Sequence, residues 1–428
     1  MEKDRFDIVL FGATGFTGKY CIPYIVKLSK VKSFSWAIAG RSEEKLMEVL
    51  KKIGAEMGSD LSSISTIVAD IGNDVSLFNM ARRAKVLINC CGPFRTLGRP
   101  VVNACLRAGT HQVDVNGDPE YMETIELEEN ENAKRKGVYI LSACGLDSIP
   151  SDMGIAFLQE NFGGTVNSAV TYMETWEEGT KTPGSAVNYT TWVSAITAFA
   201  NKERLVELRR RLYPKEMPML RPRLKRKILP HKSDLVNGWV LPFPGSDHSV
   251  VERSQRYFYE KEFKRPVQVD TLCVAESFFY VILLAILGIM FTIFSAFEWG
   301  RKFMIDHPEL FSNGVFSKNE PSREKIEKTW FAVTVQGKGW KHTPSNKDLV
   351  LATPCNQSMV VRVKGRNPCY GATAACLVCA AVTVLTQSGK MPGRGGVYPP
   401  AAAFAKTSLI ELLNENDVTF EIISNKQI

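Results

Sequence analysis

Three glycines near the N-terminus have the spacing of a loop that binds a dinucleotide. In "IVLFGATGFTG", residues 8–18, an apolar run leads directly into Gly12, Gly15 and Gly18. The first glycine allows a tight turn, the second lets the backbone approach the pyrophosphate, and the third lets the next helix pack closely on the sheet. The N-terminus of that helix then faces the negative charge of the phosphates. We therefore predict a dinucleotide site rather than a bare turn, contacted by Gly12, Thr14, Gly15, Phe16, Thr17 and Gly18.

The end of the second apolar run indicates which dinucleotide binds. Enzymes that use NAD commonly carry a carboxylate here to hold the ribose 2′-hydroxyl. This chain has Gly40, Arg41 and Ser42 in "AGRS", and its first carboxylate is Glu43. A guanidinium and a hydroxyl attract a 2′-phosphate, whereas a carboxylate would repel it. The prediction is NADP(H); in the alternative interpretation, Arg41 is only a surface charge.

Two later strand ends extend this predicted site. Asp70 and Ile71 follow the third apolar run, where they would flank the adenine. The fourth run ends in "NCCGP", in which Cys91, Gly92 and Pro93 would lie along the ribose and nicotinamide. Both segments are predicted cofactor contacts.

These residues need a parallel sheet to bring them together, and the first part of the chain predicts one. Short apolar runs alternate with longer amphipathic segments at intervals of roughly 25 residues. This alternation is typical of an α/β, doubly wound Rossmann sheet. The expected strands are residues 6–13, 34–41, 63–71, 85–93, 110–117 and 138–145.

The pattern changes after residue 150 and predicts a second, mixed α+β domain. Its expected strands, residues 164–176, 328–340 and 358–365, do not alternate with helices. We expect a dinucleotide-binding domain over 1–160, a substrate and oligomerisation domain over 161–390, and a C-terminal helix and strand over 391–428 that border the cleft.

One segment of the second domain is apolar enough to meet lipid. Residues 277–297, "SFFYVILLAILGIMFTIFSAF", contain no charged side chain. Three interpretations remain: a spanning helix, a helix or hairpin embedded in one leaflet or a droplet surface, and a helix buried in an oligomer. A single span would divide the second domain across the membrane, which favours the embedded helix. Gly288 near its middle permits the bend of a hairpin.

Composition narrows the classes of partner. The chain of 428 residues carries a net charge of +8, much of it in residues 204–232. No aromatic-interleaved motif or recognition helix accompanies this basic strip, so we expect no nucleic-acid partner. The strip suits an anionic lipid surface or a solvated loop and helix face.

The cysteines indicate reduced thiols and a domain that faces the cytosol. Ten are present without disulfide-type spacing, and the N-terminus has no secretory apolar region. Cys376 and Cys379 form the one close pair, but a second pair or histidines would be needed nearby for zinc. The sequence predicts a buried helix there and no metal site.

Other catalytic patterns are weak or missing. Tyr257 and Lys261 have the Y-x-x-x-K spacing of short-chain dehydrogenases, but they lie outside the predicted Rossmann sheet. One chance match is expected among 12 tyrosines and many lysines. We therefore assign this pair no role.

Five motifs in this order resemble the saccharopine dehydrogenase-like oxidoreductase family, in its animal, lipid-droplet-associated branch. They are "FGATGFTG", "AGRS", "NCCGPF", "GLDSIPSDMG" and "GGVYPPAAAF". The resemblance covers essentially the whole chain. It implies an NADP(H)-dependent oxidoreductase with a Rossmann domain and a mixed domain, a homodimer, and association with a lipid droplet or membrane.

The resemblance also implies which residues border the nicotinamide. Asp147 and Ser148 of "GLDSIP" and Gly396 of "GGVYPP" would lie beside the cleft, and Asp147, Ser148 or a water would supply a proton. In the alternative interpretation, Asp147 and Ser148 form a capped turn before Pro150. Relatives often carry tyrosine where this chain has Phe94, which leaves no proton donor at that position.

The substrate is predicted from what the chain contains and lacks. Saccharopine carries three carboxylates and would need several fixed arginines, but only Arg362 and Arg366 stand on the later strands. The apolar segment suits a lipid-linked substrate instead. Our first hypothesis is an NADP(H)-dependent reductase of an enoyl or carbonyl group in a lipid-like or acyl-linked substrate. The alternatives are an enzyme for a soluble amino-acid imine and a nucleotide-binding lipid-droplet protein without turnover.

Overall fold

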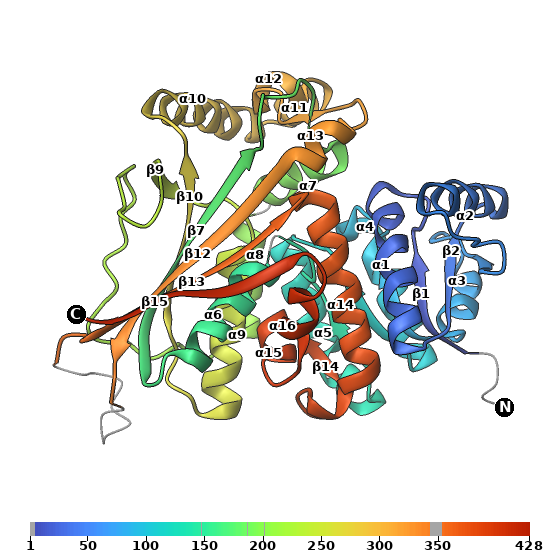
Figure 1. Ribbon diagram of the computed structural model, residues 1–428, viewed down its shortest axis with the longest axis horizontal. Coiled ribbons are helices and arrows are strands. Elements are labelled where there is room, and N and C mark those ends of the chain that lie inside the picture. The colour runs from blue at the N-terminus through green and yellow to red at the C-terminus, as the bar shows by residue number, and fades with distance from the viewer. Residues whose placement is uncertain (1–4, 147, 186, 201, 343–352) are drawn as a thin grey trace. The chain divides into compact units, whose positions relative to one another are not determined.

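The computed structural model describes residues 5–146, 148–185, 187–200, 202–342 and 353–428 (Figure 1). The chain forms two compact units: unit 1 combines residues 1–146 with 370–417, and unit 2 combines 147–369 with 418–428. The chain passes between the units at residues 146 and 370, whereas the predicted domain boundaries are 160 and 390. Each difference moves one helix to the other unit, as described below.

Unit 1 is built on a sheet of seven parallel strands in the order β14-β6-β5-β4-β1-β2-β3. The first six strands of the chain have the order 3-2-1-4-5-6 of dinucleotide-binding folds, which confirms the predicted Rossmann sheet. Most of their apolar side chains are buried on both faces, as expected for a parallel sheet covered by helices; Val68 at the end of the edge strand β3 is exposed. The strands are β1 (Phe6–Phe11), β2 (Trp36–Gly40), β3 (Ser65–Val68), β4 (Ala84–Asn89), β5 (His111–Asp114), β6 (Tyr139–Leu141) and β14 (Gly396–Tyr398).

The helices between these strands begin at residues whose side chains or geometry favour a helix start. The Ser42 hydroxyl accepts a hydrogen bond from the Lys45 N–H at 3.3 Å and so caps the helix that follows. Asn73 and Asp118 cap two further helices in the same way. The helices are α1 (Phe16–Lys32), α2 (Glu43–Met57), α3 (Asp74–Ala81), α4 (Phe94–Ala108) and α5 (Pro119–Lys136).

A helix from the far end of the chain completes unit 1. The predicted buried helix is confirmed as α14 (Thr373–Gln387), in which Cys376 and Cys379 are fully buried. It packs against α1, β4 and β5, so it belongs to the Rossmann unit and not to the second domain. Every residue from Thr373 to Val384 is buried, which is why this helix is apolar all round. The remaining elements here are the π-helical turn Pro368–Ala372, the 3-10 turn Ser388–Lys390, α15 (Pro400–Phe404) and α16 (Leu409–Asn414).

Unit 2 contains a mixed six-stranded sheet in the order β15-β13-β12-β7-β10-β9. Only β10 and β7 run parallel; the other neighbours are antiparallel. This confirms the predicted mixed second domain. The strands are β7 (Thr165–Glu177), β9 (Trp239–Pro242), β10 (Gln268–Ala275), β12 (Thr329–Trp340), β13 (Gln357–Arg366) and β15 (Val418–Gln427).

Two helices cover one face of this sheet. They are α6 (Ile149–Asn161), which packs on β12 and β13, and α9 (Asp247–Glu262), which packs on α6 and β10. A β-carbon on Gly154 of α6 would meet methyl groups of Val363 and Val335 at 3.2 and 3.3 Å. The sequence prediction assigned α6 to the first domain, whereas its contacts assign it to unit 2.

A group of helices at one end of unit 2 surrounds a separate apolar cluster (Figure 1). Trp192, Ile196, Met304 and Phe311 form its buried centre. The elements are β8 (Val187–Asn188), α7 (Tyr189–Ala200), α10 (Phe278–Ser295), α11 (Glu298–Asp306), α12 (Pro308–Ser312), β11 (Phe316–Ser317) and α13 (Arg323–Lys328). Helix α8 (Lys202–Leu212) lies near α9 instead, where the Arg209 guanidinium donates a hydrogen bond to the Ser249 hydroxyl at 2.9 Å.

The apolar segment forms one unbroken helix, α10, so the bend that Gly288 would permit is not present and the hairpin interpretation is wrong. Met290, Phe291 and Phe294 pack on the apolar cluster, while other side chains point outward. Among the residues that the structure describes, two helices are long and apolar enough to cross a membrane, Phe278–Ser295 and Pro368–Lys390. Burial separates them: 83% of the second but only 11% of α10 is buried. The second is therefore a core helix of unit 1.

Candidate functional site

The glycine loop lies where β1 ends and α1 begins, at the carboxyl edge of the parallel sheet. Gly12 adopts a φ of +83°, which favours glycine, and its N–H donates to the Ala39 carbonyl at 3.0 Å. A β-carbon at Gly12 would lie 2.8 Å from the Cys91 Sγ atom. One on Gly18 would collide with the Gly12 carbonyl and lie 2.8 Å from the Ala13 Cα atom. Both glycines are thus required by close approach.

This loop leaves a helix N-terminus free to bind phosphate. Gly15 occupies the N-cap of α1, and no side chain caps the helix. The N–H groups of the first helical residues, Phe16, Thr17 and Gly18, have no carbonyl partner earlier in the helix. A pyrophosphate would satisfy these donors, so the residues present fit the phosphates of a dinucleotide.

Arg41 follows β2 at the same edge of the sheet. It is exposed and makes no ion pair within the part of the chain that the structure describes. Its positive charge is near enough to oppose the rise in the pKa of the Cys91 thiol, which lies beside Gly12. Ser42, also predicted to contact the cofactor, both caps α2 and donates a hydrogen bond to Glu44 at 2.7 Å. Arg41 is therefore the better placed of the two for a 2′-phosphate.

The residues at the end of β3 shape a turn. Asp70 is exposed, and its Oδ1 atom accepts a hydrogen bond from the Gly72 N–H at 2.9 Å. The Asp70 backbone N–H donates a hydrogen bond to the Ser76 hydroxyl at 3.0 Å. Ile71 beside it is half-buried. The turn thus presents an aliphatic side chain and a carboxylate at the predicted position of the adenine.

The segment after β4 lies directly against the glycine loop. The Cys90 N–H donates to the Phe11 carbonyl at 2.9 Å, and Gly92 and Pro93 lead into α4. Burial raises the pKa of the Cys91 thiol to about 12, with the neighbouring Cys90 adding to the shift and Arg41 opposing it. Cys91 is therefore a neutral thiol at physiological pH, suited to packing and not to nucleophilic attack.

Asn89 is a residue of this site that the sequence did not single out. It is fully buried, and its Oδ1 atom accepts a hydrogen bond from the Cys91 N–H at 3.0 Å. Its Nδ2 atom has no partner among the described residues. A buried donor without a partner is costly, so this atom is a second feature that fits a bound cofactor. An asparagine directly before "CCGP" was the available signal.

Tyr370 is a second residue that the sequence did not predict. Its ring packs 4.3 Å from the ring of Phe16 and stacks at 5.5 Å on Tyr20, with centroids as reference points. Tyr370 lies just before α14 in the sequence, so only the return of the chain to unit 1 brings it beside α1. This aromatic group supports the first turn of the phosphate-binding helix.

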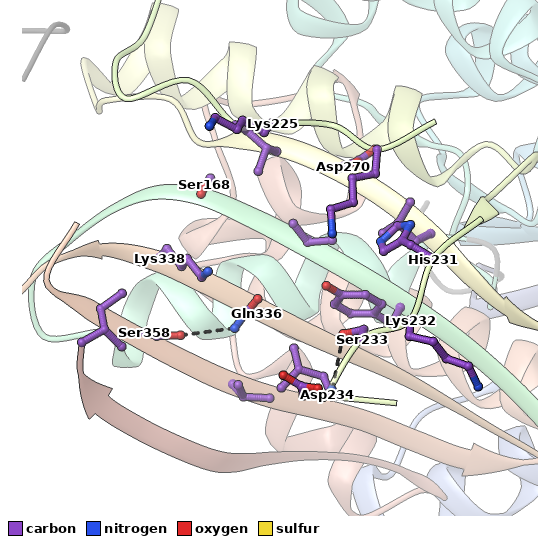
Figure 2. A pocket seen from close by; sticks show the side chains of 18 of the residues that line it. Ser168, Lys225, His231, Lys232, Ser233, Asp234, Asp270, Gln336, Lys338 and Ser358 are labelled. Carbon is purple, nitrogen blue, oxygen red and sulfur yellow. Dashed lines mark hydrogen bonds between the residues drawn. The ribbon is translucent and has the colours of Figure 1, made fainter. Parts of the chain in front are cut away.

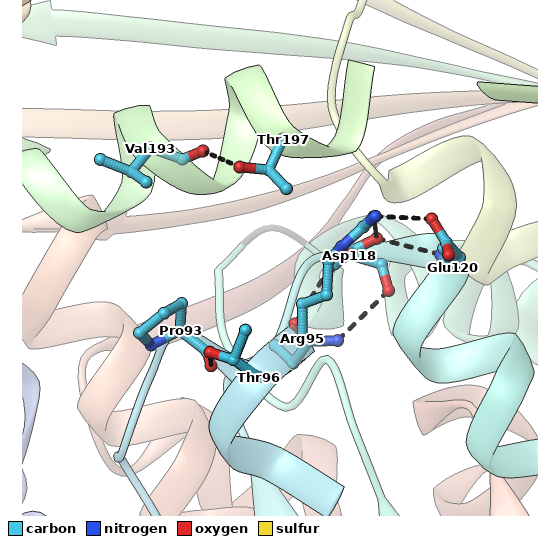
Figure 3. A network of polar contacts seen from close by, with 8 residues as sticks. Pro93, Arg95, Thr96, Asp118, Glu120, Val193 and Thr197 are labelled. Atoms are coloured by element: carbon cyan, nitrogen blue, oxygen red, sulfur yellow. Dashed lines mark hydrogen bonds and ion pairs between the residues drawn. The ribbon is translucent and has the colours of Figure 1, made fainter. Parts of the chain in front are cut away.

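An ion-pair network holds the start of α4 against the start of α5 (Figure 3). Both Asp118 oxygens accept hydrogen bonds from Arg95, at 2.7 and 3.0 Å, and Glu120 lies 2.6 Å from the same guanidinium. Arg95 is thus fully engaged with two carboxylates. It fixes the loop after β4 and is not available for an anionic substrate.

A buried carboxylate lies at the end of β5. Burial raises the pKa of Asp114 to about 6, although hydrogen bonds from the Asn116 N–H and the Gln112 and Ser142 side chains oppose this shift. All three hydrogen bonds are 3.0 Å long. They join the ends of β5 and β6, so Asp114 orders the carboxyl edge of the sheet.

The predicted catalytic pair lies where the chain passes from unit 1 to unit 2. Asp147 is outside the described residues. Ser148 occupies the N-cap of α6, but its side chain makes no capping hydrogen bond. Its buried hydroxyl has no partner among the described residues. The geometry therefore does not support a cap by Ser148 and leaves its hydroxyl available.

Gly396 differs from its expected place. It begins β14 and pairs with Tyr139, at the amino end of the parallel strands. Dinucleotides bind beyond the carboxyl ends, so the residues of this motif nearest that edge are Tyr398 and Pro399. Gly396 instead makes room for Tyr398: a β-carbon there would lie 2.7 Å from the tyrosine ring.

Other candidate groups are absent or engaged elsewhere. Within the described residues, no three His, Cys, Asp or Glu side chains gather as metal ligands would. Tyr257 and Lys261 lie on α9 of unit 2, not in the Rossmann unit. Both later arginines are held, Arg362 by Thr334 at 3.2 Å and Arg366 by Glu178 at 2.6 Å.

The role of Arg41 can be tested by reversing its charge. In Arg41→Asp we expect NADPH affinity to fall about a hundredfold, because charged hydrogen bonds of about 1.5–3 kcal/mol are lost and repulsion replaces them. NADH affinity should stay the same or improve. Titration of both cofactors by fluorescence measures this. Arg82→Asp, the same charge change beyond the end of α3, is the control; equal affinities of the native protein for both cofactors would contradict the assignment.

Comparisons with known proteins agree with this geometry. A model of the saccharopine dehydrogenase NADP binding domain matches residues 8–141. The saccharopine dehydrogenase-like oxidoreductase of Homo sapiens is 36% identical over 434 residues, which cover 100% of this chain and 99% of the human protein. The lipid droplet localized protein of Caenorhabditis elegans is 33% identical over 422 residues, covering 98% of this chain and 99% of that protein.

Two further similarities are more limited. The trans-acting enoyl reductase of Mycobacterium leprae (strain TN) is 37% identical over 155 residues, 36% of this chain and 35% of that protein. Apo saccharopine dehydrogenase (L-Glu forming) from Saccharomyces cerevisiae superposes with a TM-score of 0.54 at 14% identity, over 98% of this chain and 100% of that chain. This second likeness concerns the fold alone. By its full-length relatives, the chain belongs to the saccharopine dehydrogenase-like oxidoreductase family, and its cofactor is NADP(H).

Proposed function

We propose that this oxidoreductase uses NADPH to reduce an enoyl or carbonyl group of a lipid-like or acyl-linked substrate at a lipid surface. The observation that carries the proposal is the exposed apolar face of α10. Ile282, Ile286, Ile289 and Ile293 recur at intervals of three or four residues and are 45–62% exposed. This spacing puts them on one side of the helix.

The neighbouring elements extend this apolar face. Large apolar side chains at both ends of α10 and on α11 are exposed as well: Phe278, Phe279, Phe297 and Trp299. The opposite side of α10 packs on the apolar cluster of unit 2. A spanning helix would need lipid all round it, whereas one packed and one free side suit a helix lying in the plane of the surface.

The names of relatives support the same location and chemistry. One full-length relative is a lipid droplet localized protein, and a partial relative is an enoyl reductase. All ten cysteines are free thiols, in keeping with units that face the cytosol. A soluble substrate with several carboxylates finds less support, because Arg95, Arg362 and Arg366 are engaged by other side chains.

In this proposal, residues of the chain would have the following roles in binding and reduction. Bound NADPH supplies a hydride. The N–H groups at the start of α1 hold the pyrophosphate, and Arg41 holds the 2′-phosphate. Gly12 and Gly92 let the backbone approach the cofactor closely. We propose that the Ser148 hydroxyl donates a hydrogen bond to the substrate beside the reacting carbon and that Asp147 or a water delivers the proton.

The test is NADPH consumption by the full-length protein on phospholipid vesicles. Enoyl and keto acyl lipids form one set of acceptors, and mixtures of amino acids with keto acids form the other. We expect oxidation of NADPH with an acyl acceptor, and mass spectrometry should show a product with two added hydrogens. Ser148→Ala should lower turnover while leaving NADPH affinity unchanged. Turnover only with the amino-acid mixtures, or none with any acceptor, would overturn the proposal.

A further inference from the structure

A cavity of about 600 Å³ lies in unit 2, on the sheet face opposite α6 (Figure 2). Val335 and Val363 face α6, so the alternating residues of β12 and β13 point the other way. Gln336, Lys338 and Ser358 are on this second face and line the cavity. The cavity is therefore separated by the sheet from the helix that carries Ser148.

A segment of the basic strip covers this face and is firmly attached. The Leu224 N–H donates to the Gln268 side chain, and the Arg226 guanidinium donates to the Val269 carbonyl, both at 2.9 Å. His231 exchanges two backbone hydrogen bonds with Val240. The residues between these attachments form one wall of the cavity, and the sheet forms the other.

The walls carry an excess of positive charge. Five lysines from three elements line the cavity, against only two aspartates. Within the described residues, none of these lysines forms an ion pair with a carboxylate. Four serine hydroxyls also line it. The charged lining residues are Lys225, Lys227, Lys232, Lys338, Lys426, Asp234 and Asp270.

The apolar part of the lining lies next to α10. Tyr172 and Leu272 belong to an apolar cluster that includes Val240 of β9. The Lys232 ammonium lies 5.1 Å from the centre of the Trp239 ring, and this ring packs 4.8 Å from the ring of Phe278, the first residue of α10. Two ring contacts thus connect the cavity with the apolar face proposed to meet lipid.

We propose that this cavity binds the phosphate-bearing headgroup of an anionic lipid. Unpaired lysines and hydroxyls complement phosphate oxygens, and lysine binds them as a point charge. Trp239 would lie at the level of the headgroups, where tryptophan is enriched. The headgroup site adds a second, lipid-specific attachment to the apolar one. This inference rests on the proposed location at a lipid surface.

The test measures binding of the full-length protein to three kinds of vesicle. They contain phosphatidylcholine alone, phosphatidylcholine with phosphatidylserine, or phosphatidylcholine with phosphatidylinositol 4-phosphate at the same surface charge. We expect at least about tenfold tighter binding to the phosphoinositide vesicles than to either other kind, because the lysines can contact the phosphate monoester of this lipid directly, whereas the general attraction to surface charge is equal for both anionic kinds. Lys225→Ala/Lys232→Ala/Lys338→Ala should lose this preference and keep the binding to phosphatidylcholine.

The control removes three exposed lysines from unit 1, in Lys51→Ala/Lys52→Ala/Lys136→Ala, and should keep the preference. A preference that survives the cavity substitutions, or that both variants lose equally, would overturn the proposal. A third outcome is that pyrophosphate binds through the cavity lysines but the protein binds all three kinds of vesicle equally. The cavity would then be a site for a soluble phosphate, and the proposal would be overturned. If instead the protein did not bind phosphatidylcholine vesicles at all, the proposed location at a lipid surface would be wrong.

Discussion

In Gly12→Ala, the affinity for NADPH is expected to fall by about a hundredfold or more, equivalent to ~2.7 kcal/mol. Gly12 has a φ of +83°, a conformation that costs a residue with a β-carbon about 1–2 kcal/mol. The added methyl group would also meet Cys91 Sγ at 2.8 Å and the Cys90 carbonyl carbon at 3.1 Å. The loop must then shift, and the N–H groups that hold the pyrophosphate shift with it. Isothermal titration calorimetry with NADPH measures this loss of affinity.

Gly58→Ala provides the matched control for this prediction. Gly58 also has a positive φ, +59°, but a β-carbon there would meet nothing within 4 Å. It ends α2 and should lose a similar amount of conformational stability without any change in NADPH affinity. If both variants bound NADPH equally well, the glycine loop would not be the phosphate site. Thermal unfolding of both variants confirms that the comparison is made between folded proteins.

Replacing the four exposed isoleucines of α10 by glutamine is expected to release the protein from lipid. Ile282, Ile286, Ile289 and Ile293 are each about half exposed, so burial of each in lipid contributes roughly 1 kcal/mol. Together they account for ~4 kcal/mol, or about a thousandfold in partition. The packed side of α10 is unchanged, so the fold should be retained. Flotation with phosphatidylcholine vesicles and imaging of droplets in cells measure the effect.

The control for this prediction replaces four exposed apolar residues of unit 1 by glutamine: Val31, Met47, Val68 and Val75. Their exposed fractions, 54–68%, are similar to those of the isoleucines, but they belong to unit 1 and lie outside the apolar segment 277–297. This variant should stay on lipid. Retention of the α10 variant on vesicles would contradict an in-plane helix and return the segment to a role in protein contacts.

The nucleotide-binding edge is the part of the protein that could be predicted best from sequence. Three local features there each require a particular type of residue. They are a backbone with positive φ, a helix packed close to a loop, and a capped helix N-terminus. Gly12, Gly18 and Ser42 therefore reveal local structure directly. The Rossmann sheet followed from the alternation of strands with helices, because right-handed crossover connections allow few arrangements of parallel strands.

Other parts of the site could not be predicted because distant segments build them. Asn89 and Asp114 gain their roles from burial beneath neighbouring strand ends, which no local pattern shows. Tyr370 and α14 return to unit 1 after a long excursion through unit 2. Apolar composition predicted that α14 is buried, but it could not say against which sheet.

For α10, composition indicated that the helix suits lipid, and packing showed which of its sides is exposed. The absence of charge over residues 277–297 indicated a helix suited to lipid, and the same property left a spanning helix, an embedded helix and a buried helix all possible. Only tertiary contacts separate its packed side from its free side. The lysine cavity is a similar case, since three of its lysines belong to the basic strip and two to strands far along the chain.

The sequence by itself determined the cofactor loop, the alternation that builds the Rossmann sheet, and the existence of an apolar helix. These features depend on backbone conformation and on burial along a single element, which neighbouring residues specify. Only the tertiary structure decided where α14 and β14 belong, which side of α10 is exposed, and that the basic strip covers a sheet face. Those outcomes depend on packing between residues hundreds of positions apart, where each contact becomes favourable only once the rest of the unit has formed.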